Sequence, residues 1–339
     1  MRRTLLPPFI IAIALISACA GTPEKGERPG WIDGQSRQYS QQLYLTGEGS
    51  GDTLDDAKDR ARADLAKQFE VAVQERSQQQ QEYRKQQQGE QSSESLNQHV
   101  TRQLITRTTR TVQGIEIAAS WEDPASHTYY ALAVLSRNKA RQQYEQQITA
   151  LDQQVAQRLK QAEKETDTLR KTGLLQQAIE TQQQRMSAQS ALQVVDPSGR
   201  GIPSPVSMGE LLRTRDSLIE RITLLPKSEG KLAFLVQPIL SGNAANAGFK
   251  IAAEKMADYT LIADTQLDPP LKEGGWIWLR GTLELTLRDA NGHDIGVRRW
   301  SLKAASITTE NTEHRLLNQI DGILKSDLRP TLLGFAMYQ

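Results

Sequence analysis

The sequence predicts an α+β protein with three folded parts: a small α/β domain over residues 31–136, a helical hairpin over 137–195 and a C-terminal α/β domain over 207–339. Three patterns carry this prediction. A short apolar stretch leads through glycines into apolar residues at helical spacing, a central stretch repeats apolar residues in a heptad-like way, and the last third alternates apolar and polar residues. We expect the C-terminal sheet to be mixed and mainly antiparallel.

Residues 1–18 have the layout of an export signal. Arginines at positions 2 and 3 are followed by an apolar run over residues 5–16, interrupted only by two prolines, and then by small residues. A run of about ten to twelve apolar residues is too short to span a bilayer as a mature helix. Residues 19–30, rich in glycine, proline and charge, predict a flexible tether.

Cys19 is the single cysteine of the chain, and it directly follows Ile16-Ser17-Ala18. This pattern resembles the lipobox of bacterial lipoproteins. The resemblance implies cleavage after Ala18, a diacylglycerol on the thiol and an acyl chain such as palmitate on the new amine. Two or three acyl chains anchor stably, since each buried methylene contributes about 0.8 kcal/mol. The alternatives are an ordinary signal peptide or an uncleaved helix with a chance cysteine.

The residue after the cysteine bears on the location. Position 20 is alanine rather than aspartate. In lipoproteins this implies sorting to the outer membrane, so the resemblance predicts a lipid-anchored outer-membrane protein whose mature domains lie in the periplasm.

Composition excludes some classes of partner. Removing the two arginines of residues 1–18 from 41 basic residues leaves 39, against 40 acidic residues. The mature chain therefore has no basic domain for nucleic acid and no polybasic membrane patch. With no second cysteine, no disulfide can form within one chain, so packing alone must hold the core.

The first domain begins with a predicted strand at residues 43–47 and a tight glycine turn at 47–51. Thr53 then predicts a helix start, with Asp56 in near-capping-box position. One face of this helix is apolar: Leu54, Ala57, Ala61, Leu65, Phe69 and Val73.

The rest of the first domain has a polar stretch and further strands. Residues 74–98 are rich in glutamine and predict a solvated helix end and a mobile loop. Residues 100–119 predict one long or two short strands and residues 129–135 another, with a turn at 123–126.

These residues also carry a family resemblance. Pro29-Gly30-Trp31, the run from Leu43 to Ser50, the alanine-rich face at 57–65 and the strand at 129–135 are similar to the LPP-twenty family of outer-membrane lipoproteins. The likeness covers roughly residues 29–140. It implies a small α/β domain on a lipid anchor, of a kind found in envelope and flagellum-associated lipoproteins, and it implies no established reaction.

The central part predicts helices. Residues 136–170 form a predicted long helix, and a second apolar stripe runs over 174–186. We expect an antiparallel hairpin that turns near Lys171-Thr172-Gly173, with one kinked helix as the alternative. The Gly/Pro-rich residues 196–205 mark a boundary.

The C-terminal domain is predicted to begin with a helix capped by Ser207 and Glu210, which ends before Pro226. We then expect a strand at 232–236, a helix at 244–256 led in by Asn243, strands at 259–267, 276–287 and 295–307 with an Asn291-Gly292 turn, and a helix at 312–328. This order resembles the periplasmic domains of the curli-export lipoprotein and of outer-membrane activators of cell-wall synthases.

The sequence predicts no catalytic, cofactor-binding or metal-binding residues. The glycines at 47–51 lack the spacing of a dinucleotide or phosphate loop, and a turn that needs positive φ explains them better. The histidines (His99, His127, His293 and His314) do not pair at metal-ligand spacing. The carboxylate pairs Asp55 with Asp56 and Glu163 with Glu165 lie among lysines and are expected to be solvated charges. Trp276 and Trp278 alternate with Ile277 and Leu279 on one strand, so they could stack on sugars or serve as core.

We therefore expect a non-enzymatic, lipid-anchored outer-membrane lipoprotein that acts through protein contacts in envelope or surface-organelle assembly, with a flagellar role as one example. An accessory activator of a cell-wall synthase or hydrolase is one alternative. A peptidoglycan- or glycan-binding module that uses Trp276 or Trp278 is another. We expect a protein partner in the envelope and no cofactor, and the oligomeric state is left open.

Overall fold

The computed structural model describes residues 28–34, 38–88, 113–253 and 256–337. Cys19, Ala18, the expected signal, residues 19–27 of the expected tether and residues 100–112 of the stretch expected to form strands over 100–119 lie outside these ranges. The chain divides into two compact units, Met1–Lys67 with Ile115–Leu135 and Gln68–Gly114 with Ser136–Gln339. Each unit combines helices with strands, and the α+β fold class is confirmed.

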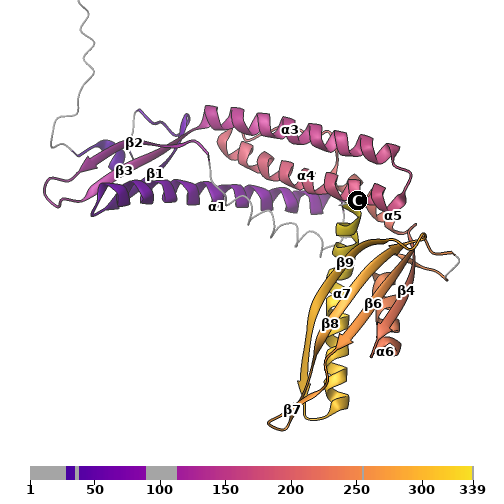
Figure 1. Cartoon of the computed structure of the whole chain (residues 1–339). Coiled ribbons are helices and arrows are strands. Elements are labelled where there is room, and N and C mark those ends of the chain that lie inside the picture. Colours follow the sequence, from indigo (N-terminus) through magenta and orange to yellow (C-terminus); the bar gives the residue numbers. More distant parts are fainter. Residues whose placement is uncertain (1–27, 35–37, 89–112, 254–255, 338–339) are drawn as a thin grey trace, which may run out of the picture. The chain divides into compact units, whose positions relative to one another are not determined.

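The first unit is built on a three-stranded sheet of order β1-β3-β2 (Figure 1). Its strands are β1 (Tyr44–Gly51), β2 (Ile115–Glu122) and β3 (Tyr129–Ser136), and β2 and β3 are antiparallel. A 3-10 turn, η1 (Gly30–Asp33), precedes the sheet. The helix α1 (Leu54–Gln88) follows β1 directly.

The predicted tight turn over residues 47–51 is wrong, because β1 continues through Gly51. Gly47 and Gly49 have no positive φ; they are glycines because α1 lies against them. A Cβ on Gly47 would collide with the backbone of Leu65, and one on Gly49 with the backbone of Ala61. The glycines therefore serve close strand–helix packing rather than a turn.

The start of α1 agrees with the sequence. The Thr53 hydroxyl accepts a hydrogen bond from the Asp56 N–H at 3.2 Å and donates to Asp56 Oδ2 at 2.7 Å. The predicted apolar face is buried from Ala57 to Val73. In the second unit α1 continues to Gln88, and Phe69 stacks on Tyr144 with ring centroids 6.3 Å apart.

The second unit contains the expected helical hairpin, formed by α3 (Arg137–Lys164) and α4 (Thr168–Val195), which run side by side in Figure 1. The hairpin turns at residues 165–167, so the turn predicted at Lys171-Thr172-Gly173 is wrong. Asp167 caps α4 by accepting from the Arg170 N–H at 2.8 Å. Gly173 lies inside α4, where the backbone of Ala336 occupies the space that a Cβ would need.

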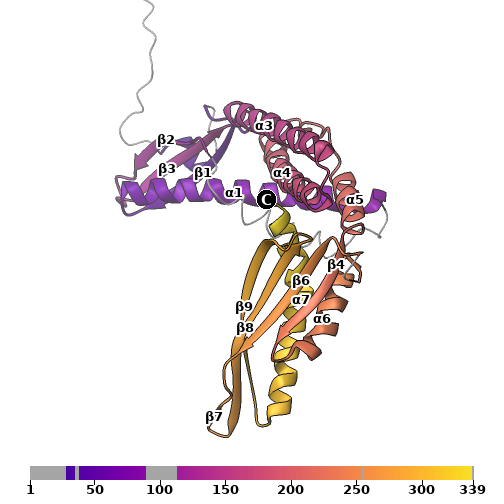
Figure 2. The ribbon, with the colours of Figure 1, turned by 45° about the vertical axis from the view of Figure 1, so that its right-hand side comes forward.

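The C-terminal sheet has six strands in the order β5-β4-β6-β8-β7, with β9 on the other side of β8 (Figure 2). The strands are β4 (Thr223–Gly230), β5 (Lys250–Ile251), β6 (Tyr259–Leu267), β7 (Leu271–Glu273), β8 (Trp276–Asp289) and β9 (Asp294–Ser306). β4 is parallel to β5 and β6, and the remaining pairs are antiparallel. The expectation of a mixed, mainly antiparallel sheet is confirmed.

The helices of this part are α5 (Met208–Ile219), α6 (Ala233–Asn246) and α7 (Thr309–Met337). The predicted first helix is too long, because residues 223–230 form β4. Ser207 does precede α5, but its hydroxyl makes no capping hydrogen bond.

The strand predicted at residues 232–236 and the helix predicted at 244–256 are both wrong, because α6 occupies residues 233–246. The local β preference of the Leu-Ala-Phe-Leu-Val run is overridden by burial at helical spacing: Val236, Leu240 and Ala244 lie four residues apart and are fully buried.

One face of the C-terminal sheet carries the core. Odd-numbered residues of β6 and β8 and even-numbered residues of β9 from Trp300 onward point to this face, where they pack against α6 and α7. The β8–β9 hairpin turns at Asn291-Gly292 as predicted, with Gly292 at φ 88°. The opposite face, called the open face below, is the one that α6 and α7 do not cover (Figures 1 and 2).

The outer edge of β9 is closed by side chains of α7. The Gln319 amide accepts from the Lys303 N–H at 3.1 Å and donates to the Ser301 carbonyl at 3.4 Å. Arg315 donates to the Ala305 carbonyl at 2.9 Å. Gln319 thus takes the place of a peptide group of a further strand, which protects this edge from pairing with other chains.

Candidate functional site

The described residues contain no group of three or more His, Cys, Asp or Glu side chains that could hold a metal ion. His127 lies 3.2 Å from Glu122 and His293 lies 3.4 Å from Asp289, both as exposed pairs. His99 lies outside the described ranges. Across those same ranges, no helix is both long and apolar enough to span a bilayer.

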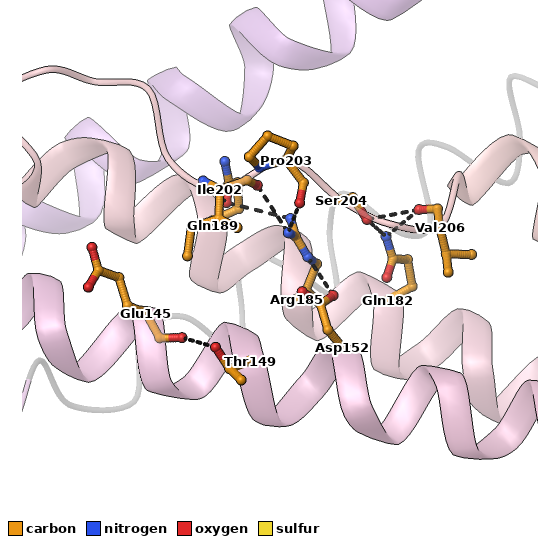
Figure 3. Close-up of polar contacts among 10 residues, drawn as sticks. All are labelled: Glu145, Thr149, Asp152, Gln182, Arg185, Gln189, Ile202, Pro203, Ser204 and Val206. Atoms are coloured by element: carbon orange, nitrogen blue, oxygen red, sulfur yellow. Dashed lines mark hydrogen bonds and ion pairs between the residues drawn. The ribbon is translucent and has the colours of Figure 1, made fainter.

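A buried polar cluster joins α3, α4 and the segment that follows α4 (Figure 3). Arg185, only 2% exposed, donates to Asp152 Oδ1 at 2.9 Å and to the carbonyls of Ile202 and Pro203 at 3.0 and 2.9 Å. Nearby, Gln182 donates to the Ser204 hydroxyl at 2.8 Å. Sequence reasoning did not predict this cluster.

This cluster holds the structure together rather than binding a ligand. The Arg185 guanidinium donates hydrogen bonds to one carboxylate, two carbonyls and the Gln189 side chain. These bonds compensate for burying its charge, which would otherwise be unfavourable. The bonds tie residues 202–206 down along α4. A shallow hollow of about 380 Å³ on α3, near Glu145 and Thr149, has a lining from that one helix and brings no chemical groups together.

The open face of the C-terminal sheet presents a graded series of side chains. Residues that face each other across antiparallel strands point to the same face of the sheet. The pairing register therefore groups the side chains of the open face into rows that cross the strands, called rungs below and given in order from the β7 end. The rungs are a mainly apolar one (Leu271, Trp278 and Ala305) with Trp276 opposite Glu273 at the β7 end, a cationic one (Arg280 and Lys303), a hydroxyl and amide one (Gln266, Thr282 and Ser301), an ion-pair one (Asp264, Glu284 and Arg299) and one of Ile262, Thr286 and Val297.

On the open face, Trp278 contacts both side chains of the cationic rung. Lys303 Nζ lies 4.9 Å from its ring centroid and the Arg280 guanidinium carbon lies 5.8 Å away, both within the range of cation–π attraction. Leu279, on the other side of β8, is only 4% exposed. The predicted alternation along this strand is confirmed, and it places Trp276 and Trp278 on the open face.

A hollow of about 650 Å³ is lined by residues of β6, β8 and β9 and by Asp268; Trp278 is not part of this lining, but Arg280 and Lys303, which are, both contact its ring. The short side chains of Thr282 and Ser301 lie opposite each other in this hollow, and the longer Arg280 and Lys303 lie opposite each other beside it. The spacing of tryptophans on one strand was visible in the sequence. The facing cations were not, although counting back from the Asn291-Gly292 turn would have paired them to within a residue or two.

The N-terminal region can be compared with known families. Its elements are a strand with alternating glycines, an alanine-faced helix packed against it and two further strands. Residues 29–136 match the family model described as LPP20 lipoprotein. The predicted resemblance to this family, which the sequence placed at residues 29–140, is confirmed. We call the matched part the LPP20 region, and the match supports a lipoprotein.

Solved structures give more distant matches. The secreted protein HP1454 from Helicobacter pylori is 12% identical and matches with a TM-score of 0.43 over 87% of this chain and 99% of that chain. A minor lipoprotein from Acinetobacter baumannii is 19% identical, with a TM-score of 0.27 over 33% of this chain and 91% of that chain. Lipoprotein GNA1162 from Neisseria meningitidis is 11% identical, with a TM-score of 0.23 over 31% and 98%. No curated protein matches the chain.

Proposed function

We propose that this protein is a lipid-anchored lipoprotein of the outer membrane that acts without catalysis, by binding another envelope protein in envelope or surface-organelle assembly. The observation that carries the contact function is the open face of the C-terminal sheet, which leaves a graded series of side chains uncovered by α6 and α7. The anchor is supported by Cys19 after Ile16-Ser17-Ala18 and by the match of the LPP20 region.

The rung of Val297, Thr286 and Ile262 is where we place the protein contact. Val297 is 47% exposed, whereas Thr286 and Ile262 beside it are only 6% and 7% exposed, so Val297 is the member of this rung that can meet a partner's apolar side chain. Ionic groups surround it: Arg299 pairs with Glu284 on one side, and Arg288 pairs with Asp294 at 2.6 Å on the other. An apolar centre with a charged rim is the usual layout of a protein interface.

Replacing Cys19 tests the anchor. We expect Cys19→Ala to release the protein from the outer-membrane fraction into the soluble periplasmic fraction, because no thiol remains to carry the lipid. Ala20→Asp is the matched control, since it keeps the thiol and should move the protein to the inner membrane. If Cys19→Ala still sediments with the outer membrane, the anchor assignment is wrong.

A photo-crosslinking residue at Val297 tests the contact. We expect irradiation of intact cells to yield one discrete adduct with an envelope protein from this position. The same residue at Lys325, on the exposed side of α7, should yield none. Equal labelling from both positions, or none from Val297, would argue against the open face as the contact surface.

A further inference from the structure

The hollow lined by Arg280, Lys303, Thr282 and Ser301 combines two kinds of group that act on different parts of one ligand. Arg280 and Lys303 supply positive charge and are positioned by contacts with the Trp278 ring, and Thr282 and Ser301 supply hydroxyls. We propose that this hollow binds an anionic glycan, a sugar chain that carries carboxylates. The proposal deepens the contact function proposed above by adding a ligand on the same face of the sheet.

The charge of the hollow selects the sign of the ligand. Within the described part of the chain, neither Arg280 nor Lys303 forms an ion pair with a carboxylate; their interactions are with the Trp278 ring. Asp268 also lines the hollow, and its N–H donates to the Arg280 carbonyl at 2.9 Å. The lining therefore holds two cations and one acid, and the neighbouring rung adds Asp264 and Glu284 against Arg299, so the positive charge is local to Arg280 and Lys303. At that end the hollow attracts a carboxylate and repels a cationic ligand.

The floor of the hollow selects the class of ligand. Thr282, Ser301 and Gln266 each both donate and accept hydrogen bonds, which matches the hydroxyls of a sugar ring. An acyl chain or an apolar peptide side chain would leave these groups without partners, at a cost. The polar lining therefore favours a sugar over a lipid tail.

The dimensions agree with a small number of sugar units. The volume of about 650 Å³ falls in the range of ordinary small-molecule sites, which is about 300–1,000 Å³. The hollow lies on an exposed sheet surface, with Arg280, Ser301 and Lys303 all solvent-accessible. A polymer can therefore cross it without threading a closed pocket.

Calorimetric titration of the full-length protein with polygalacturonate, and with its methyl ester, tests the proposal. The two probes share a sugar backbone and differ in carboxylate charge. We expect the acid form to bind at least about tenfold more tightly than the ester, with affinity that falls as salt is added. Equal binding of the two forms, or no binding of either, would overturn the proposal.

Variants locate the site. Lys303→Gln should weaken binding by about tenfold or more, because it removes a cation of the lining, while Arg288→Gln should change it less than about twofold. Trp278→Ala should also weaken binding, because the ring that positions Arg280 and Lys303 is lost. Arg288→Gln is the matched control, because it removes one positive charge from the same face of the same sheet, outside the hollow. Lys303 is exposed, so its variant keeps the test valid if Trp278→Ala fails to fold. Unchanged binding in Lys303→Gln would overturn the assignment.

Two further measurements separate the sources and the alternatives. Solubilised peptidoglycan fragments compared with polygalacturonate distinguish a cell-wall ligand from another acidic polysaccharide, and binding of either one through Lys303 supports the proposal. Binding to vesicles of anionic phospholipid that depends on Lys303, without binding to either glycan, would overturn it in favour of a membrane surface. Loss of glycan binding with the Val297 crosslink intact would leave the contact function standing, so the two proposals fail separately.

Discussion

The hydroxyl of Tyr259 on β6 donates a hydrogen bond to Asp167 Oδ2 at 2.8 Å. Asp167 is also the residue whose other carboxylate oxygen caps α4. One carboxylate therefore caps the start of α4 and also accepts a hydrogen bond from the first residue of β6, a central strand of the C-terminal sheet. This bond joins the hairpin to the C-terminal sheet inside the second unit, where Tyr259 is 8% exposed.

We expect Tyr259→Phe to lower the free energy of unfolding of the second unit by about 1–2 kcal/mol, because a buried hydrogen bond to a charged group is lost. Urea denaturation followed by circular dichroism measures this change. Tyr129→Phe, a half-buried tyrosine on β3, serves as the control. Equal loss in both variants would show that the bond to Asp167 contributes nothing of its own.

The same tyrosine predicts a pH dependence. Burial, and then the hydrogen bond and charge of Asp167, raise the pKa of Tyr259 well above its usual value near 10. Folding therefore favours the protonated phenol, and its stabilising contribution is complete below about pH 10 and falls at higher pH, where the unfolded chain ionises. We expect Tyr259→Phe to lose stability less steeply than wild type between about pH 10 and pH 11. Parallel curves would contradict the shift.

Two helical glycines should respond in opposite ways to alanine. Gly173 in α4 faces the backbone of Ala336, whereas Gly322 in α7 has open space around its Cα. Alanine favours a helix by about 1 kcal/mol over glycine, so Gly322→Ala should stabilise by about 0.5–1 kcal/mol. Gly173→Ala should instead destabilise by about 1–3 kcal/mol through overpacking. Thermal unfolding of the pair decides this, and stabilisation by both would refute the close approach of α4 and α7.

Arg185 should be among the costliest single residues to remove. We expect Arg185→Leu to destabilise by about 3–5 kcal/mol, since Asp152 and two carbonyls lose their donor. Arg141→Leu is the matched control, because Arg141 and Glu145 form an exposed pair at 3.8 Å on α3 and such pairs contribute less than about 1 kcal/mol. Chemical denaturation gives both values. A loss below about 1 kcal/mol in Arg185→Leu would mean that the segment over residues 202–206 keeps its position without the hydrogen bonds from Arg185.

Gln319 should matter more for solubility than for stability. We expect Gln319→Leu to leave the fold intact but to cause concentration-dependent self-association, because it exposes the Lys303 N–H and the Ser301 carbonyl at the edge of β9. Analytical ultracentrifugation detects this. Asn318→Leu places the same apolar group on the exposed side of the same helix and should remain as wild type. Association of both variants would trace the effect to surface hydrophobicity instead.

Prediction from sequence succeeded where burial repeats with a local period. The apolar face of α1, the strand at residues 259–267 and the Asn291-Gly292 hairpin all follow from spacing and turn chemistry, and all are confirmed. Prediction failed where contacts with distant parts of the chain overrode the local preference of the residues. Residues 232–236 have strand-like composition yet begin α6, because Val236, Leu240 and Ala244 bury one helical face in the C-terminal core.

The glycines show the same division. Gly47, Gly49 and Gly173 were interpreted as chain breakers, since glycine usually marks turns. In the structure each lies within a regular element at a point where another backbone comes close. Positive φ is a local property, whereas close approach depends on an element elsewhere in the chain, and the absence of a Cβ looks identical in both cases.

The candidate site divides in the same way. The sequence by itself determined that Trp276 and Trp278 share a face of one strand, and it carried the pattern around Cys19 from which the anchor is proposed. Only the tertiary structure decided that this face is the open one and that Lys303 meets Arg280 across the hairpin beside Thr282 and Ser301. The physical reason is range: alternation is set by the backbone geometry of a single strand, whereas the exposed face depends on which side of the sheet α6 and α7 cover.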